Sequence, residues 1–257
     1  MLLVVDIGGT HTRVGVSIDG QTLGDIKIFN TPQDYQQAIK QISDTALSLS
    51  QNQTIDQAVV GVAGTLNVER NSLTLAPHIL DFVNQPLKKD LAVMLSTKVY
   101  LENDAALAAL GEAHFGAGKN YGVVGFLTIG TGVGGARVVA GKLDPEFLNY
   151  EPGHRLYSES QLTLEEQISG SALNNRYHLD SEQINDPIIW NQVATDLFLA
   201  LNKLSETWKP DIFILGGAVS QKIPLENLPL TFKVTLGELG AKSGLMGGLA
   251  YLQQLNN

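Results

Sequence analysis

Two glycine-rich turns in the sequence have the composition of phosphate-binding loops. The first is Asp6-Ile7-Gly8-Gly9-Thr10, and the second is Gly130-Thr131-Gly132-Val133-Gly134-Gly135. Glycine allows backbone N–H groups to converge on an anion without interference from a Cβ atom. An ordinary tight hairpin remains the alternative for a single Gly-Gly turn. Two such turns in one chain favour phosphate binding, with the turns facing each other across a chain of phosphates.

Polar residues around the first turn strengthen this interpretation. Thr10 and Thr12 add hydroxyl donors, and Arg13 adds a positive charge. Asp6 ends a buried strand, where a carboxylate is placed to hold a phosphate-bound Mg²⁺ or its water. The second turn is not a Rossmann fingerprint, because a strand follows it, and it lacks the Lys-Ser/Thr pair of a Walker motif.

A third glycine turn, Gly216-Gly217, follows the apolar run Ile212 to Leu215. It would let a nucleotide base and ribose lie against the backbone. A close-packed structural turn explains the same residues equally well.

Candidate acid–base and hydroxyl-binding residues lie outside these turns. Asp104 is placed to take a proton from an attacking hydroxyl while Asn103 orients the substrate, although Asp104 as a helix cap is an equal alternative. His154, close to Glu151, is the best ligand contact among the five histidines. Glu165 adds a carboxylate, for which a solvated helix face is the alternative. Carboxylates, an Asn and a His suit hydrogen bonds to a polyol.

Two α/β lobes are predicted to position these residues, with boundaries at 1–116 and 117–257. Each lobe begins with two strands bent around one of the glycine turns, and Asp19-Gly20 is interpreted as a hairpin turn. Thr31-Pro32 is expected to open a helix, and 143–162 is expected to be an irregular insertion. Further segments expected as strands are 24–30, 58–62, 98–101 and 212–215, and as helices 87–95, 104–115, 164–177, 187–208 and 244–255.

Composition narrows the functional classes. The chain has 257 residues, with 17 Lys and Arg against 26 Asp and Glu, a formal charge of −9. That balance argues against nucleic-acid binding and against docking on an anionic membrane. No apolar run approaches the roughly 18 residues of a membrane span, and no targeting segment is visible. With no Cys, disulfides and Cys-ligated zinc are excluded. A cytoplasmic protein is expected.

The motifs, taken in order, resemble those of the ROK family of repressors, open-reading-frame proteins and sugar kinases. The matching segments run almost from end to end: Asp6 to Thr10, Glu102 to Ala105, Gly130 to Gly135, Glu151 to His154, Glu165 to Gly170, and Leu215 to Gly217. The resemblance implies a hexokinase/actin-like ATPase fold, with two ribonuclease-H-like lobes around a central cleft. It also implies Mg²⁺- and ATP-dependent phosphorylation of a hexose, with glucose at the 6-hydroxyl as first choice, by a homodimer.

The resemblance also implies residue roles. Asp104 resembles the general base, and Asn103, Glu151, His154, Glu165 and His78 occupy sugar-contact positions. Gly8, Gly9, Thr10, Gly130, Thr131 and Gly132 resemble the phosphate cradle, Asp6 lies near Mg²⁺, and Gly216 and Gly217 face the adenosine.

Some positions depart from the family pattern, and other functions stay open. The family's Cys-rich zinc loop is replaced by Arg155 to Glu159, so no zinc is expected. His78 stands where an Asn is typical. The alternatives are a kinase for fructose, mannose or an N-acetylhexosamine, a kinase that uses polyphosphate, and a non-catalytic sugar sensor.

Overall fold

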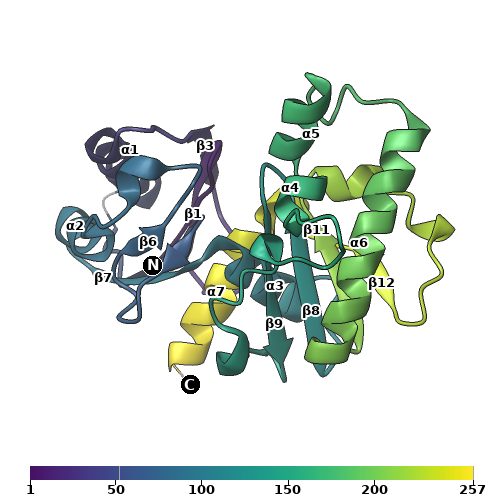
Figure 1. The fold of residues 1–257 in the computed structure, drawn as a ribbon. Coiled ribbons are helices and arrows are strands. Elements are labelled where there is room, and N and C mark those ends of the chain that lie inside the picture. The colour runs from purple at the N-terminus through teal and green to yellow at the C-terminus, as the bar shows by residue number, and fades with distance from the viewer. Residues whose placement is uncertain (52, 257) are drawn as a thin grey trace. The chain divides into compact units, whose positions relative to one another are not determined.

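The computed structural model describes residues 1–51 and 53–256. The chain divides into two compact units (Figure 1). Unit 1 comprises Met1–His114 and the described residues from Lys242 onward, and unit 2 comprises Phe115–Ala241. The first boundary lies close to the expected residue 116. The expected lobe 117–257 needs a correction, because the C-terminal helix returns to the sheet of unit 1.

Unit 1 is built on a five-stranded sheet in the order β3-β2-β1-β4-β7. Its strands are β1 (Leu2–Ile7), β2 (His11–Ser17), β3 (Ile26–Asn30), β4 (Gln57–Val62) and β7 (Lys98–Asn103). β1 pairs antiparallel with β2, and β4 and β7 continue the sheet in parallel. A small two-stranded sheet adds β5 (Thr65–Leu66) and β6 (Leu73–Leu75).

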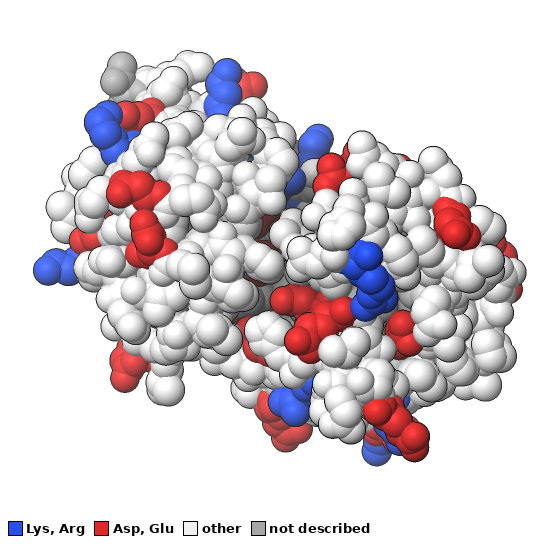
Figure 2. Space-filling model, turned by 45° about the horizontal axis from the view of Figure 1, so that its top comes forward, with Lys and Arg blue, Asp and Glu red and all other residues white. Residues whose placement is uncertain are grey.

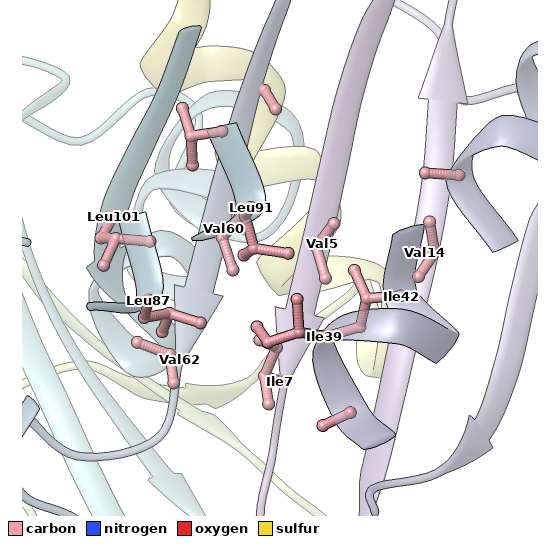
Figure 3. Close-up of a cluster of buried hydrophobic side chains, with 14 of the residues drawn as sticks. Val5, Ile7, Val14, Ile39, Ile42, Val60, Val62, Leu87, Leu91 and Leu101 are labelled. Carbon is pink, nitrogen blue, oxygen red and sulfur yellow. The ribbon is translucent and has the colours of Figure 1, made fainter. Parts of the chain in front are cut away.

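Alternating apolar residues give this sheet two buried faces. On one face, Val5, Ile7 and Val60 lie in a core cluster with residues of α1 (Tyr35–Ser50) and α2 (Leu87–Leu95) (Figure 3). On the other face, Val4 and Val59 approach α7 (Ser243–Asn256), where a Cβ added to Gly248 would lie 3.0 and 2.9 Å from their side chains.

The helix α3 (Asp104–Phe115) crosses α7 with the two backbones in contact. A Cβ added to Gly247 would lie 1.6 Å from the Leu107 carbonyl oxygen, and one added to Gly111 would lie 2.2 Å from that of Ser243. Since α3 begins at Asp104, this close crossing fixes the helix that carries the candidate base.

Unit 2 repeats the topology of unit 1. Its sheet has the order β10-β9-β8-β11-β12, with β8 and β9 antiparallel and β11 and β12 added in parallel. The strands are β8 (Val123–Ile129), β9 (Val133–Val139), β10 (Lys142–Leu143), β11 (Ile212–Gly216) and β12 (Val234–Leu236). The prediction that each half begins with two strands bent around a glycine turn is confirmed.

Helices α4 (Leu164–Ile168), α5 (Gly170–Tyr177) and α6 (Pro187–Trp208) complete unit 2. The insertion 143–162 is attached by aromatic contacts, because the rings of Phe147 and Tyr150 lie 6.1 and 5.6 Å from that of the fully buried Trp208. Short 3₁₀ turns occur in both units, at Leu80–Phe82, Pro145–Phe147, Pro152–His154, Val219–Lys222, Leu225–Asn227 and Gly240–Lys242.

Three local predictions are corrected by the structure. The first helix begins after Asp34, whose side chain accepts from the Gln37 N–H, and not at Thr31-Pro32. Asp19-Gly20 lies in the longer loop 18–25 and is not a two-residue hairpin turn. The expected helix 164–177 is interrupted at Ser169, which ends α4 and caps α5.

Candidate functional site

The first glycine turn is closed by buried hydroxyls. The Gly8 N–H donates to the His11 carbonyl oxygen at 3.0 Å, and the Thr31 hydroxyl donates to the Gly8 carbonyl oxygen at 2.7 Å. Thr12 is fully buried, with its Oγ1 3.0 Å from Oγ1 of Thr31. Thr12 therefore braces the turn from inside, and its prediction as a phosphate contact is withdrawn. Thr10 is exposed at the tip of the turn.

Asp6 and Arg13 form an ion pair across the β1–β2 hairpin, where they are register partners. Arg13 Nη1 lies 3.3 Å from Asp6 Oδ2, and the two side chains are 24% and 14% exposed. Burial raises the pKa of the Asp6 carboxyl, and the charge of Arg13 opposes that rise. The first turn of α7 also approaches this carboxylate, because a Cβ added to Gly244 would lie 3.2 Å from Asp6 Cγ.

His78 packs directly on the first turn. A Cβ added to Gly9 would lie 2.6 Å from His78 Cβ, so only glycine fits there without a shift. Nε2 of His78 is buried and has no hydrogen-bond partner among the described residues. The structure thus places His78 beside the candidate phosphate turn.

Asn103 caps helix α3, and Asp104 is the first residue of that helix. Asn103 Oδ1 accepts from the Ala106 N–H at 3.0 Å, and its Nδ2 donates to the Gly64 carbonyl oxygen at 3.1 Å. Asn103 is therefore the N-cap of α3, and Asp104 Oδ1 also accepts from the Ala105 N–H at 2.9 Å. The two bonds of the Asn103 amide use only one of its N–H groups and one of its lone pairs.

An ion pair that the sequence does not predict adjoins the backbone of Asn103. Glu102 is 3% exposed and pairs with Arg70, while its Oε1 also accepts from the Asn103 N–H at 2.8 Å. The pair fixes the backbone where β7 becomes α3. Glu102 was visible in the polar run before α3, but nothing in the sequence connects it to Arg70, 32 residues earlier.

The second glycine turn is held from behind by the start of α5. The Gly130 and Thr131 carbonyl oxygens accept from the N–H groups of Gly170 and Ser171, at 2.7 and 3.1 Å. In a planar trans peptide the N–H points opposite to the C=O. The N–H groups of Thr131 and Gly132 therefore point away from α5, and a Cβ added to Gly130 would meet nothing within 4 Å. This arrangement suits an anion.

The predicted hydroxyl-binding residues of unit 2 lie beside this turn. His154 Nε2 and Glu165 Oε1 are 4.0 Å apart, and the side chains are 37% and 22% exposed. Glu165 Oε2 accepts from the Val133 N–H at 2.7 Å. Glu151 precedes this pair in a left-handed conformation with φ of 49°, so the turn brings His154 next to Glu165.

Close packing accounts for the third glycine turn. A Cβ added to Gly216 would lie 2.7 Å from the Phe126 ring, and one added to Gly217 would lie 2.2 Å from the Ile129 carbonyl oxygen. Gly217 also has φ of +85°, which favours glycine. Both glycines are needed for packing, and the solvent side of Gly217 remains exposed.

On the face drawn in Figure 2, the described Lys and Arg side chains are scattered and do not form a continuous basic patch. Within residues 1–51 and 53–256, no helix is long and apolar enough to cross a membrane. The same residues contain no group of three or more His, Asp or Glu that could hold a metal ion.

Comparisons with known proteins agree with the sequence motifs. A glucokinase from Thermotoga maritima is 37% identical over 147 residues, which cover 55% of this chain but only 45% of that protein. A polyphosphate glucokinase from Mycobacterium tuberculosis is 30% identical over 261 residues, which cover 92% of this chain and 88% of that protein.

The fold is shared with solved structures of actin-like sugar kinases, as expected. A ROK family glucokinase from Streptomyces griseus in complex with glucose and AMPPNP matches with a TM-score of 0.83 and 26% identity. The match covers 98% of this chain and 99% of that one. The ROK family model itself matches residues 2–234. This chain therefore belongs to the ROK family.

Proposed function

We propose that this protein transfers the γ-phosphoryl group of ATP to a hexose, with glucose and its 6-hydroxyl as the first choice. The observation that carries the proposal is the second glycine turn, whose outward N–H groups lie in the same unit as His154 and Glu165. The similarity to a glucokinase solved with glucose and AMPPNP supports the same donor and acceptor.

The residues fit a magnesium–nucleotide complex. The outward N–H groups of Thr131 and Gly132 suit phosphate oxygens. The Gly130 N–H donates to the Gly132 carbonyl oxygen, and the open space beside Gly130 leaves the approach free. Gly8, Gly9 and Thr10 are the corresponding candidates in unit 1. Asp6 supplies a carboxylate for Mg²⁺ or its water, and Arg13 balances its charge. Gly216 and Gly217 remain proposed adenosine contacts.

The chemistry assigned to this chain is positioning and proton transfer. Magnesium–ATP, when bound, supplies the phosphoryl group and the neutralising cation. Asp104 accepts the proton of the hexose hydroxyl as the hydroxyl oxygen bonds to the γ-phosphorus, and the bond from that phosphorus to the bridging oxygen of ADP breaks. The remaining N–H of Asn103 is proposed to orient the sugar, as are Glu151, His154, Glu165 and His78. Arg70 and Glu102 hold the backbone of Asn103.

Two other functions are tested beside this one. A polyphosphate donor is favoured by the relative from Mycobacterium tuberculosis, which is named a polyphosphate glucokinase. A non-catalytic sugar sensor would keep the hydroxyl contacts and would not need Asp104. The homodimer and the cytoplasmic location stay predictions.

The test is sugar-dependent release of ADP by the purified protein. Glucose, fructose, mannose and N-acetylglucosamine are each offered with Mg²⁺ and either ATP or polyphosphate, and phosphorylated product is followed where no ADP can form. We expect turnover with ATP and the highest kcat/KM with glucose. Turnover with polyphosphate and none with ATP would show that polyphosphate, and not ATP, is the phosphoryl donor. Glucose binding by calorimetry without any turnover would establish the sensor instead.

A further inference from the structure

Residue 133, at the end of the second glycine turn, is held from two sides by the segments that carry the candidate sugar contacts. On one side, Glu165 Oε2 accepts from the Val133 N–H at 2.7 Å. On the other, a Cβ added to Gly153 would lie 2.0 Å from the Val133 carbonyl oxygen. His154 therefore follows a residue that already touches the backbone of the turn.

The two oxygens of Glu165 face different groups. Oε2 is bonded to the turn, whereas Oε1 lies 4.0 Å from His154 Nε2. That distance is too long for a hydrogen bond, but a ligand hydroxyl could bond to both atoms. A hydroxyl placed there would fix the carboxylate and with it the bond to Val133.

We propose that Glu165 is a positioning residue, which couples occupancy of the hydroxyl site at His154 to the phosphate-binding shape of turn 130–133. The inference rests on the proposed function, since it takes the hydroxyl ligand to be the acceptor hexose and the anion to be the nucleotide phosphate. Sugar bound at Glu165 and His154 orders the turn, and the ordered turn binds phosphate more tightly.

The carbonyl bonds from Gly170 and Ser171 explain how one carboxylate has this effect. They fix Gly130 and Thr131, whereas Val133, the first residue of β9, pairs with Ile129 across the turn. Glu165 adds the side-chain bond to the Val133 N–H. Glu165 and Gly170 also lie in consecutive short helices joined at Ser169.

The experiment is calorimetric titration of AMPPNP with Mg²⁺, with and without saturating glucose. In the wild type, glucose should tighten AMPPNP binding by about 5-fold or more, and AMPPNP should tighten glucose binding by the same factor, because coupling between two ligands is reciprocal. In Glu165→Ala, sugar-free AMPPNP binding should weaken by about 10-fold, as expected for loss of a charge-assisted hydrogen bond, and the coupling should vanish.

Two further variants separate coupling from a general loss of structure. Glu165→Gln keeps an oxygen for the Val133 N–H, so sugar-free AMPPNP affinity should return to within about threefold of wild type. The factor by which glucose tightens AMPPNP binding should fall towards 1 in this variant, because an amide NH₂ replaces the second acceptor oxygen. Glu166→Ala is the matched control, since Glu166 is exposed and its carboxylate bonds Thr163 in the capping box of α4. It should bind both ligands as the wild type does.

Unchanged coupling in Glu165→Gln or Glu165→Ala, or an equal loss in Glu166→Ala, would overturn the inference while leaving the proposed function intact. If the wild type binds neither glucose nor AMPPNP, the proposed function fails first and the inference with it. Thermal melting of each variant shows whether it is folded, and if Glu165→Ala is not, Glu165→Gln alone decides the question.

Discussion

The two glycine turns occupy equivalent places in sheets of the same topology, yet they are stabilised differently. The turn of unit 1 is closed by side chains, namely the Asp6–Arg13 ion pair, Thr31 and the ring of His78. The turn of unit 2 is held by backbone bonds from Gly170 and Ser171 and has open space beside Gly130. A shared topology thus fixes where a turn lies, while the neighbouring residues decide whether the space beside its glycines is filled or open.

The largest expected effect concerns Asp104, the proposed proton acceptor, which follows the last residue of β7 in unit 1. Asp104→Asn should lower kcat by about 10²- to 10⁴-fold, because the amide cannot accept the hydroxyl proton. KM for glucose should change far less, and the thermal midpoint should hardly move, since Asn103 still caps α3 and an amide oxygen at position 104 can still accept from the Ala105 N–H. Steady-state kinetics measures both constants. Asp81→Asn, an exposed carboxylate of the same unit, is the control and should be fully active.

The difference in packing between the two turns is tested by replacing one glycine of each turn with alanine. Gly9→Ala forces a Cβ against His78 and should cost about 1–3 kcal/mol of unfolding free energy. Gly130→Ala meets no atom within 4 Å and should leave stability within about 0.5 kcal/mol of wild type, while the methyl group obstructs phosphate and raises KM for ATP. Urea unfolding and kinetics on both variants check this. Equal destabilisation of the two would remove the distinction.

The N-cap residues of α3 and α5 should contribute equally to stability, but only the first should also affect activity. Asn103→Ala and Ser169→Ala each remove an N-cap side chain, and each should cost about 1 kcal/mol. Only Asn103→Ala should also raise KM for the sugar directly, since Asn103 is a proposed hexose contact. If chemical denaturation shows no loss in Asn103→Ala, the cap assignment is wrong.

The smallest effect is a pH dependence confined to the first turn. Because burial raises the pKa of Asp6 in the folded protein, the folded state binds more protons there than the unfolded state. Its contribution to stability is then present at low pH and is lost as pH rises through the folded pKa. The unfolding free energy of wild type minus that of Asp6→Asn should therefore decrease as the pH rises above about 3.8, the ordinary pKa of an Asp. If this difference instead increases with pH, the charge of Arg13 outweighs burial in setting the pKa of Asp6.

Local patterns in the sequence were sufficient for most of the elements and for the equivalence of the two hairpins. The apolar runs and the glycines between them predict β1, β2, β8 and β9. The role of Thr12 was misassigned because its hydroxyl meets Thr31, a partner 19 residues away. The return of α7 to unit 1 depends on contact with strands at the other end of the chain.

The candidate site was predictable only where a motif carried it. Glycine runs and the Asn103-Asp104 pair are visible in the sequence, whereas Arg70 has no local signal and acts through a buried carboxylate. The contacts of turn 130–133 with Gly170 and Glu165 are likewise tertiary, because they depend on how α4 and α5 lie against the turn. Residue types therefore predict which side chains are candidates for the site, but not the tertiary hydrogen bonds that hold them in position.

The most direct test of the account is the transfer of labelled phosphate. ATP labelled at the γ-phosphate, Mg²⁺ and glucose are mixed with the wild type and, separately, with Asp104→Asn, and the sugar product is identified by mass spectrometry and NMR. We predict labelled glucose 6-phosphate from the wild type, formed about 10²- to 10⁴-fold more slowly by the variant. No labelled sugar from the wild type, or equal rates for both proteins, would contradict the account.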